Sequence, residues 1–279
     1  MTTYAERLAE LKAKSRYAAP IRRKDTAKGH YYRADDGTRV PGVTTLISDG
    51  VPKPALINWA ANVTAEGAVD QWDDLGALPP AQRLKTLQGL RYAEKDKAAK
   101  RGTEVHRAAE KLLAGQEVQV PEEIAGHVEA YSRFLDDFKV EPVHVEFSCV
   151  SYRWGYAGTA DLCAYAVLPE QGRKLLIWDL KTSRSGIFGE TALQLAAYRY
   201  ADVWVVDGRE VEPAACDFAA GIHVRADGYD VLPVEADELQ HKAFLYAAKV
   251  AEWSKASRDL VGPPVMAPTL STFRLVRES

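Results

Sequence analysis

The stretch KLLIWDLKT (174–182) holds a nearly continuous apolar run that ends in Asp179 and Lys181. A short apolar run of this kind predicts a strand that is buried on both faces of a sheet. Two segments before it, PVHVEFSCVSYRW (142–154) and YAGTADLCAYAVL (156–168), alternate apolar and polar residues and are rich in β-formers. The three segments therefore predict three neighbouring strands of one sheet.

Helical spacing and turn signals surround these strands. The expected helices cover about 54–69, 80–99, 102–114, 122–138, 190–204 and 236–256. A second strand pair is expected at about 216–225 and 229–234, and HYYRADDGTRVPGVTTLI (30–47) reads as a hairpin with Asp36-Gly37 at its turn. The pattern predicts an α+β fold in one domain: a helical N-terminal half (1–100, with an arm and the hairpin), a core (101–256) and an irregular tail (257–279).

Composition narrows the class of protein. Hydrophobic residues make up 47% of the 279 residues and charged residues 27%, which is typical of a globular chain. We expect a soluble, cytoplasmic protein with no membrane partner, because no apolar run is long enough for a membrane span and the N-terminus has no signal-peptide core. Cys149, Cys163 and Cys216 are scattered and form no C-x-x-C pair, so we expect buried, small apolar residues rather than a zinc site or a disulfide.

The distribution of charge is more informative than its sum. A net charge of −3 argues at first against nucleic acid. Residues 7–28, however, carry eight basic side chains against two acidic ones, an excess of six positive charges. This segment is either an arm that contacts DNA phosphates or a solvated, partly disordered tail, and the sequence favours neither.

The predicted strand at 174–182 carries a chemical motif. Residues i and i+2 of a strand share a face, so Asp179 and Lys181 project together, while Leu180 turns into the core and leaves its carbonyl as an additional oxygen ligand. The same acidic-x-Lys spacing occurs at Glu10 and at Asp137, but both lie in helical surroundings, where residues i and i+2 do not share a face. Asp161 lies 18 residues upstream of Asp179, at the end of GTAD (158–161), and a strand–turn–strand hairpin would bring the two together. Phosphodiester hydrolysis needs carboxylates that hold divalent cations and benefits from a nearby lysine, so this group predicts a nuclease.

Four segments in order resemble a known family. GYAGTAD (155–161), LLIWDLKTS (175–183) and ALQLAAYRYA (192–201) are similar to successive motifs of the PD-(D/E)XK nuclease superfamily, in its RecB-like exonuclease branch, and RGTEVHRAAE (101–110) resembles that branch's histidine-bearing helix. VPGVTTLI and PALINWAA (40–61) resemble, more weakly, the front part of phage-type, stand-alone members. The resemblance implies a restriction-endonuclease-like core with a central mixed sheet flanked by helices.

The resemblance also implies roles for single residues. Asp161 and Asp179 would bind Mg²⁺ or Mn²⁺ with the Leu180 carbonyl, Lys181 would position and help to deprotonate the attacking water, and His106 would be a further metal ligand. Glu146 is either another ligand or a solvent-facing residue of an edge strand. Gln194 and Tyr198 match the family's Q-x-x-x-Y and share a helix face that would touch the DNA or the site, or serve only the structure. Gly158 would let metal or DNA approach the backbone closely.

Taken together, these features predict a divalent-metal-dependent DNA exonuclease, a phosphodiester hydrolase of DNA recombination, repair or replication. An inactive DNA-binding or recombination-accessory module and a structure- or site-specific endonuclease of the same fold remain as alternatives. With three cysteines we expect no iron–sulfur cluster, and no helicase P-loop is present, so a separate recombinase, single-strand-binding protein or helicase is the partner that the resemblance implies. Four aromatic residues suit stacking on single-stranded bases, although core packing is expected for most of them: Tyr31, Tyr32, Trp59 and Trp72.

Overall fold

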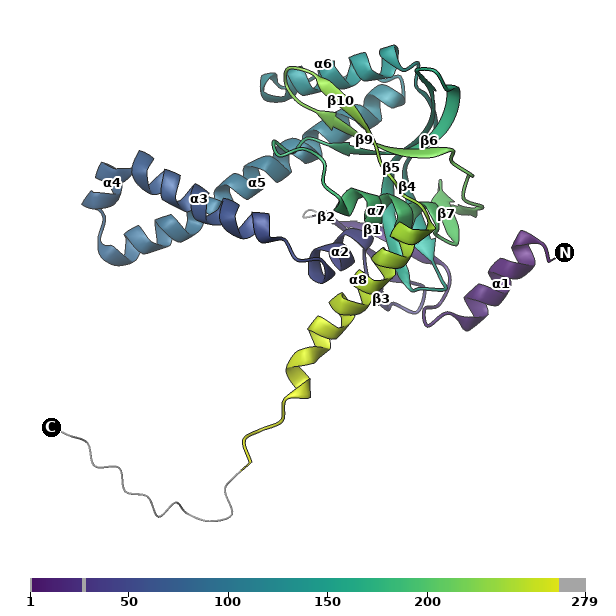
Figure 1. Cartoon of the computed structure of the whole chain (residues 1–279), viewed down its shortest axis with the longest axis horizontal. Coiled ribbons are helices and arrows are strands. Elements are labelled where there is room, and N and C mark those ends of the chain that lie inside the picture. Colours follow the sequence, from purple (N-terminus) through teal and green to yellow (C-terminus); the bar gives the residue numbers. More distant parts are fainter. Residues whose placement is uncertain (1, 27–28, 266–279) are drawn as a thin grey trace.

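A seven-stranded mixed sheet lies at the centre of the computed structural model, which describes residues 2–26 and 29–265 (Figure 1). Its strand order is β10-β9-β6-β5-β4-β7-β8. The strands are β4 (Glu141–Ser151), β5 (Tyr156–Leu168), β6 (Gly172–Lys181), β7 (Val203–Val206), β8 (Arg209–Val211), β9 (Phe218–Val224) and β10 (Tyr229–Pro233). β6 pairs with β9 in parallel, and the other pairs in this sheet are antiparallel. The predicted α+β class with a mixed central sheet is confirmed.

β6 lies inside the sheet and is buried on both faces, as its apolar run predicts. Leu176, Ile177 and Trp178 are at most 2% exposed. Ile177 contributes to one hydrophobic cluster, whereas Leu176 and Trp178 contribute to another on the opposite face. This alternation also puts Asp179 and Lys181 on the face of Ile177.

Helices cover both faces of the sheet. α2 (Val43–Gly50), α7 (Glu190–Arg199) and α8 (Glu238–Ala256) share a hydrophobic cluster with one face. The C-terminal part of α5 (Pro80–Leu113) and α6 (Glu122–Asp137) pack on the other face, where α6 buries Ile124, Val128, Tyr131 and Phe134 at helical spacing. The three cysteines are buried free thiols, as expected.

The first half of α5 projects from the sheet beside α3 (Pro54–Asp70), and α4 (Trp72–Ala77) joins them (Figure 1). The sequence predicts two helices where α5 is a single one of 34 residues, so that expectation is wrong. Gly102, at the expected break, costs a helix only about 1 kcal/mol. Trp59 and Trp72 are 37% and 72% exposed, so core packing is also the wrong expectation for them, although Tyr32 is buried as expected.

The N-terminal segment is folded rather than a loose arm. α1 (Tyr4–Lys14) packs Tyr4, Leu8 and Leu11 against a third hydrophobic cluster. β1 (Ile21–Thr26), β2 (Gly29–Ala34) and β3 (Arg39–Val40) form a separate antiparallel sheet. A solvated tail is therefore the wrong reading of the described part of 7–28. Lys28 lies outside the described residues.

Two boundaries differ from the sequence-based expectation. The predicted hairpin ends at Val40, and α2 follows because Val43, Leu46 and Ile47 bury one helix face. The helix predicted over 190–204 ends at Arg199, and Val203–Val206 pairs with β4 as β7. Residues 257–260 form a short 3-10 helix, and the predicted tail from 266 onward lies outside the described residues. Within the described part of the chain, no helix has the length and apolarity that a membrane span requires.

Candidate functional site

A cavity of about 460 Å³ lies between the small sheet, α5, α7 and strands β4 to β6. We call it the central cavity. It is lined by seven of the eight residues that the sequence selects: His106, Glu146, Asp161, Asp179, Lys181, Gln194 and Tyr198. The eighth, Leu180, has its side chain in the hydrophobic core, and its carbonyl stays a predicted ligand. The fold therefore brings together side chains that span 93 positions of the sequence, from 106 to 198, counting both ends.

The hairpin of β5 and β6 brings Asp161 close to Asp179, as predicted. The pairing of β5 with β6 begins at Leu162 and Trp178, which are the chain neighbours of Asp161 and Asp179 on the side of the turn. Asp161 Oδ2 accepts a hydrogen bond of 2.7 Å from the Leu180 backbone N–H. The Asp161 carboxylate is thus tied to the strand that carries Asp179 and Lys181.

Glu146 enters the site through a local distortion of β4. Its neighbours Val145 and Phe147 pair with Leu162 and Ala160, so Glu146 lies across from Asp161. The backbone of Glu146 has φ 47°, a left-handed conformation that a residue with a side chain seldom adopts. Such a conformation costs on the order of 1–3 kcal/mol and is frequent at functional sites. The sequence leaves Glu146 open between a ligand and a solvent-facing residue of an edge strand. In the structure it lines the central cavity, and β4 lies between β5 and β7 rather than at the edge of the sheet.

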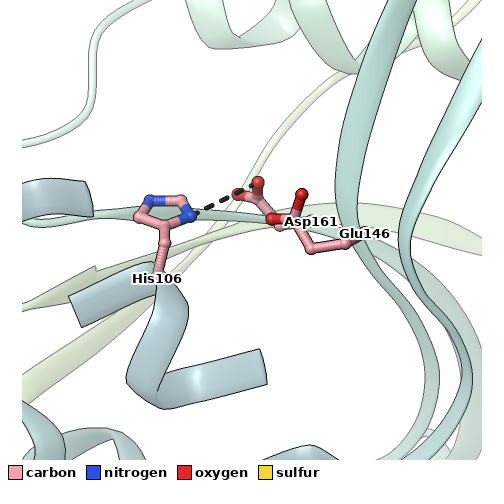
Figure 2. A group of neighbouring side chains, drawn as sticks. All are labelled: His106, Glu146 and Asp161. Carbon is pink, nitrogen blue, oxygen red and sulfur yellow. Dashed lines mark ion pairs between the residues drawn. The ribbon is translucent and has the colours of Figure 1, made fainter. Parts of the chain in front are cut away.

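His106, Glu146 and Asp161 form the best candidate metal centre among the described residues. One potential ligand atom from each lies within 4.8 Å of the others. Figure 2 shows the imidazole reaching from α5 toward two carboxylates that come from neighbouring strands. His106 Nδ1 is 3.5 Å from Asp161 Oδ1. An imidazole with two carboxylates is a donor set that suits a divalent cation such as Mg²⁺ or Mn²⁺.

Asp179 lies beside this group of three, in a contact with Lys181. Lys181 Nζ is 2.5 Å from Asp179 Oδ2, and Gln194 Nε2 donates a 2.7 Å hydrogen bond to Asp179 Oδ1. Asp179 Oδ2 is buried, accepts no hydrogen bond from the described residues and has the Lys181 ammonium group beside it as an ion-pair partner. A buried carboxylate oxygen in that situation fits a cation as a partner.

Gln194 and Tyr198 differ in their surroundings although they share a helix face. Gln194 lines the cavity and contacts both Asp179 and Lys181, the latter at 3.5 Å through Oε1. Tyr198 is 2% exposed, and its hydroxyl lies 3.2 Å from Gln194 Nε2. Its ring fills the space above Gly158, where an added Cβ would lie 2.3 Å from Tyr198 Cε1. Gly158 therefore makes room for a protein side chain, which replaces the sequence-based expectation of an open approach for metal or DNA.

The charges in the cavity influence one another. Burial lowers the pKa of His106, but the Asp161 carboxylate outweighs burial and raises it to about 9. Burial raises the pKa of Asp161, but the charge of His106 brings it below its ordinary value. The pKa of Asp179 is raised by burial, and that of Glu146 by burial and by Asp161. Four carboxylates line the cavity, and those of Asp179 and Glu146 have raised pKa values, so a bound cation would relieve repulsion there.

Residues of the small sheet complete the cavity, and the sequence gives no motif for them. Arg23 donates to Glu146 Oε2 at 3.2 Å and to Thr159 Oγ1 at 3.3 Å. Tyr32 and Thr159 share a hydrogen bond of 2.7 Å between their hydroxyl groups. His30, which has no recognisable partner in the sequence, also lines the cavity. The only available signal was the basic run at 7–28, which does not say that one member turns inward.

Comparisons with known proteins add no function. No family model matches the chain, and no curated protein matches it. A solved structure titled "Crystal structure of SSO0001" is 15% identical over 58% of this chain and 76% of that one, with a TM-score of 0.25. A likeness of this size supports no conclusion about either fold or activity.

Proposed function

We propose that the protein is a divalent-metal-dependent deoxyribonuclease that hydrolyses phosphodiester bonds in the central cavity. The observation that carries the proposal is the close group of His106, Glu146 and Asp161 next to the Asp179–Lys181 pair. The sequence resemblance to PD-(D/E)XK nucleases supports the same assignment through residues of the same site. Arg23 and Arg107, which also line the cavity, supply positive charge for a phosphate backbone.

Each residue has a role that follows from its position. His106, Glu146 and Asp161 would hold Mg²⁺ or Mn²⁺, and Asp179 would add its buried Oδ2. The bound cation would supply charge stabilisation at phosphorus and lower the pKa of a water. Lys181, beside Asp179 in the cavity, would place a fixed positive charge near the attacking water and the phosphate. Gln194 keeps Asp179 and Lys181 in position through its amide.

The direct test is digestion of end-labelled linear DNA by the full chain, in single-stranded and duplex form. We expect cleavage with Mg²⁺ or Mn²⁺ and none with EDTA. Asp161→Asn, which keeps the shape of the side chain but removes its charge, should reduce the rate at least about 10²-fold. Asp74→Asn changes an exposed aspartate of α4 and should leave the rate unchanged. Equal cleavage by wild type and Asp161→Asn, or no cleavage of any DNA by wild type, would refute the proposal.

A further inference from the structure

A second and larger cavity adjoins the central cavity. Its volume is about 1040 Å³, and it lies between α3, the middle of α5 and the segment from Thr182 to Leu193. We call it the α3–α7 groove. His106 and Lys181 line both spaces, so the groove leads directly to the candidate centre. Figure 1 shows that the α3 and α5 walls of this groove belong to the part of the molecule that projects from the sheet.

The walls of the groove carry more positive than negative charge. Five basic residues besides Lys181 line it: Lys53, Lys95, Lys97, Arg101 and Arg184. Two acidic residues, Glu94 and Glu190, also line it, and Glu190 is 3.7 Å from Lys53 in an ion pair. A polyanion therefore finds complementary charge along this path.

Two aromatic side chains are exposed in the groove, on different walls. Trp59 belongs to α3 and is 37% exposed, and Phe188 precedes α7 and is 53% exposed. A base presents its face to such a side chain only when it is unstacked, because the faces of bases in a duplex cover one another. Aromatic platforms in a basic groove are the combination with which proteins bind single-stranded nucleic acid.

From this geometry we infer that the α3–α7 groove binds a single strand of DNA and delivers it to the candidate centre. Bases would stack on Trp59 and Phe188, while phosphates face Lys97 and Arg101 on α5. The inference rests on the proposed function in one respect. It assumes that cleavage takes place where the groove meets the central cavity, at His106 and Lys181. It assigns the substrate class, which the catalytic residues themselves leave open.

The test measures binding separately from cleavage. The full chain in EDTA is titrated with a fluorescent oligo-dT single strand and with a blunt duplex of equal length. Trp59→Ala and Phe188→Ala should each weaken single-strand binding at least about fivefold, because base–aromatic stacking contributes at this level or above. Duplex binding should change less than twofold. Trp59→Phe, which keeps an aromatic face, should restore most of the single-strand affinity.

Trp72→Ala is the matched control, since Trp72 is 72% exposed on α4 and lines neither cavity. Unchanged single-strand binding in both groove variants would overturn the inference and favour a protein segment as the occupant. An equal loss for single strand and duplex would also overturn it. If wild type cleaves no DNA, yet single-strand binding depends on Trp59 and Phe188, the proposed nuclease fails while the groove assignment stands.

Discussion

At the scale of single residues, the site depends on contacts that cross between strands and helices. Lys181 illustrates this, because its ammonium group is held by Asp179 from its own strand and approached by Gln194 from α7. Burial lowers the pKa of Lys181, but the carboxylates of Asp179 and Asp161 more than compensate and raise it above its ordinary value. The raised pKa keeps the side chain charged at neutral pH. Under the proposed function this favours a fixed positive charge over the help in deprotonating the water that the sequence resemblance implies.

Lys181→Met should reduce DNA cleavage about 10²–10³-fold while leaving the metal requirement in place, because it removes a charge but no metal ligand. Initial rates at saturating Mg²⁺ would measure the loss. Lys85→Met, an exposed lysine of α5, provides the control. Turnover within a few-fold of wild type would show that Lys181 serves only the fold.

His106→Ala should raise the Mg²⁺ concentration for half-maximal cleavage at least about tenfold, since losing even an outer partner of a metal ligand has an effect of that size. The supporting geometry is the ligand group formed with Glu146 and Asp161. His127→Ala on α6 should leave the metal titration unaltered. An unchanged half-maximal concentration in His106→Ala would remove His106 from the centre.

Gly158→Ala should destabilise the protein by about 1–3 kcal/mol, the usual effect of forcing an extra methyl group into a packed region. The new Cβ would lie 2.3 Å from Tyr198 Cε1 and 3.0 Å from Val43 Cγ2. Gly89→Ala, in α5 with open space around it, should instead stabilise by about 0.5–1 kcal/mol. Urea unfolding of both variants would measure these free energies, and a loss of stability in Gly89→Ala alone would contradict the packing argument.

At the scale of elements, α1 and α5 use their basic residues differently. On α1, Arg7 and Lys14 form ion pairs with Glu212 and Glu10, and Lys12 pairs with Glu210. These pairs connect the N-terminal helix to its surroundings and to itself. On α5, by contrast, Lys95 and Lys97 line the α3–α7 groove. Three of the eight basic residues at 7–28, those of α1, therefore already have acidic partners within the protein.

The salt dependence of single-strand binding should separate these two helices. Neutralising Lys97 and Arg101 together by substitution with Gln should reduce the log–log salt slope by about 1.4, since each phosphate contact on a single strand contributes about 0.7. Neutralising Arg7 and Lys14 should leave the slope unaltered. A smaller slope in the α1 variant, with no change in the α5 variant, would reverse the assignment and return the DNA contact to the N-terminal segment.

At the scale of the whole molecule, the candidate centre lies where three bodies of structure meet. The central sheet supplies Asp161, Asp179 and Lys181, the long helix α5 supplies His106, and the small N-terminal sheet covers the cavity with Arg23 and Tyr32. The groove on the α3 side is a second opening to the same residues. This arrangement suits a strand that is received from one end.

We expect an exonuclease with little sequence preference, since the proposed contacts are to phosphates and to base faces, which carry little sequence information. Linear and circular single-stranded DNA of one sequence, incubated with Mg²⁺, would test this. The linear form should disappear while the circle persists. Rapid conversion of the circle to linear fragments would instead identify an endonuclease.

The sequence by itself determined the parts that depend on neighbours in the chain. The run at 174–182 predicts a strand buried on both faces, and the i, i+2 spacing predicts that Asp179 and Lys181 share a face, because the strand period is two. Helices with one apolar face, such as α6, were equally readable. The boundaries of elements were harder to predict from the sequence. The break expected within α5 does not occur, because a single glycine destabilises a helix only slightly and packing can offset that cost.

Only the tertiary structure decided which side chains meet across long stretches of chain. Glu146 joins His106 and Asp161 because β4 pairs with β5 there and α5 packs alongside, whereas alternation alone left Glu146 open between a ligand and a solvent-facing residue. The inward turn of Arg23, the burial of Tyr198 against Gly158 and the exposure of Trp59 likewise depend on packing between distant segments. Local patterns constrain dihedral angles and faces, whereas contacts between distant residues depend on how whole elements fit together.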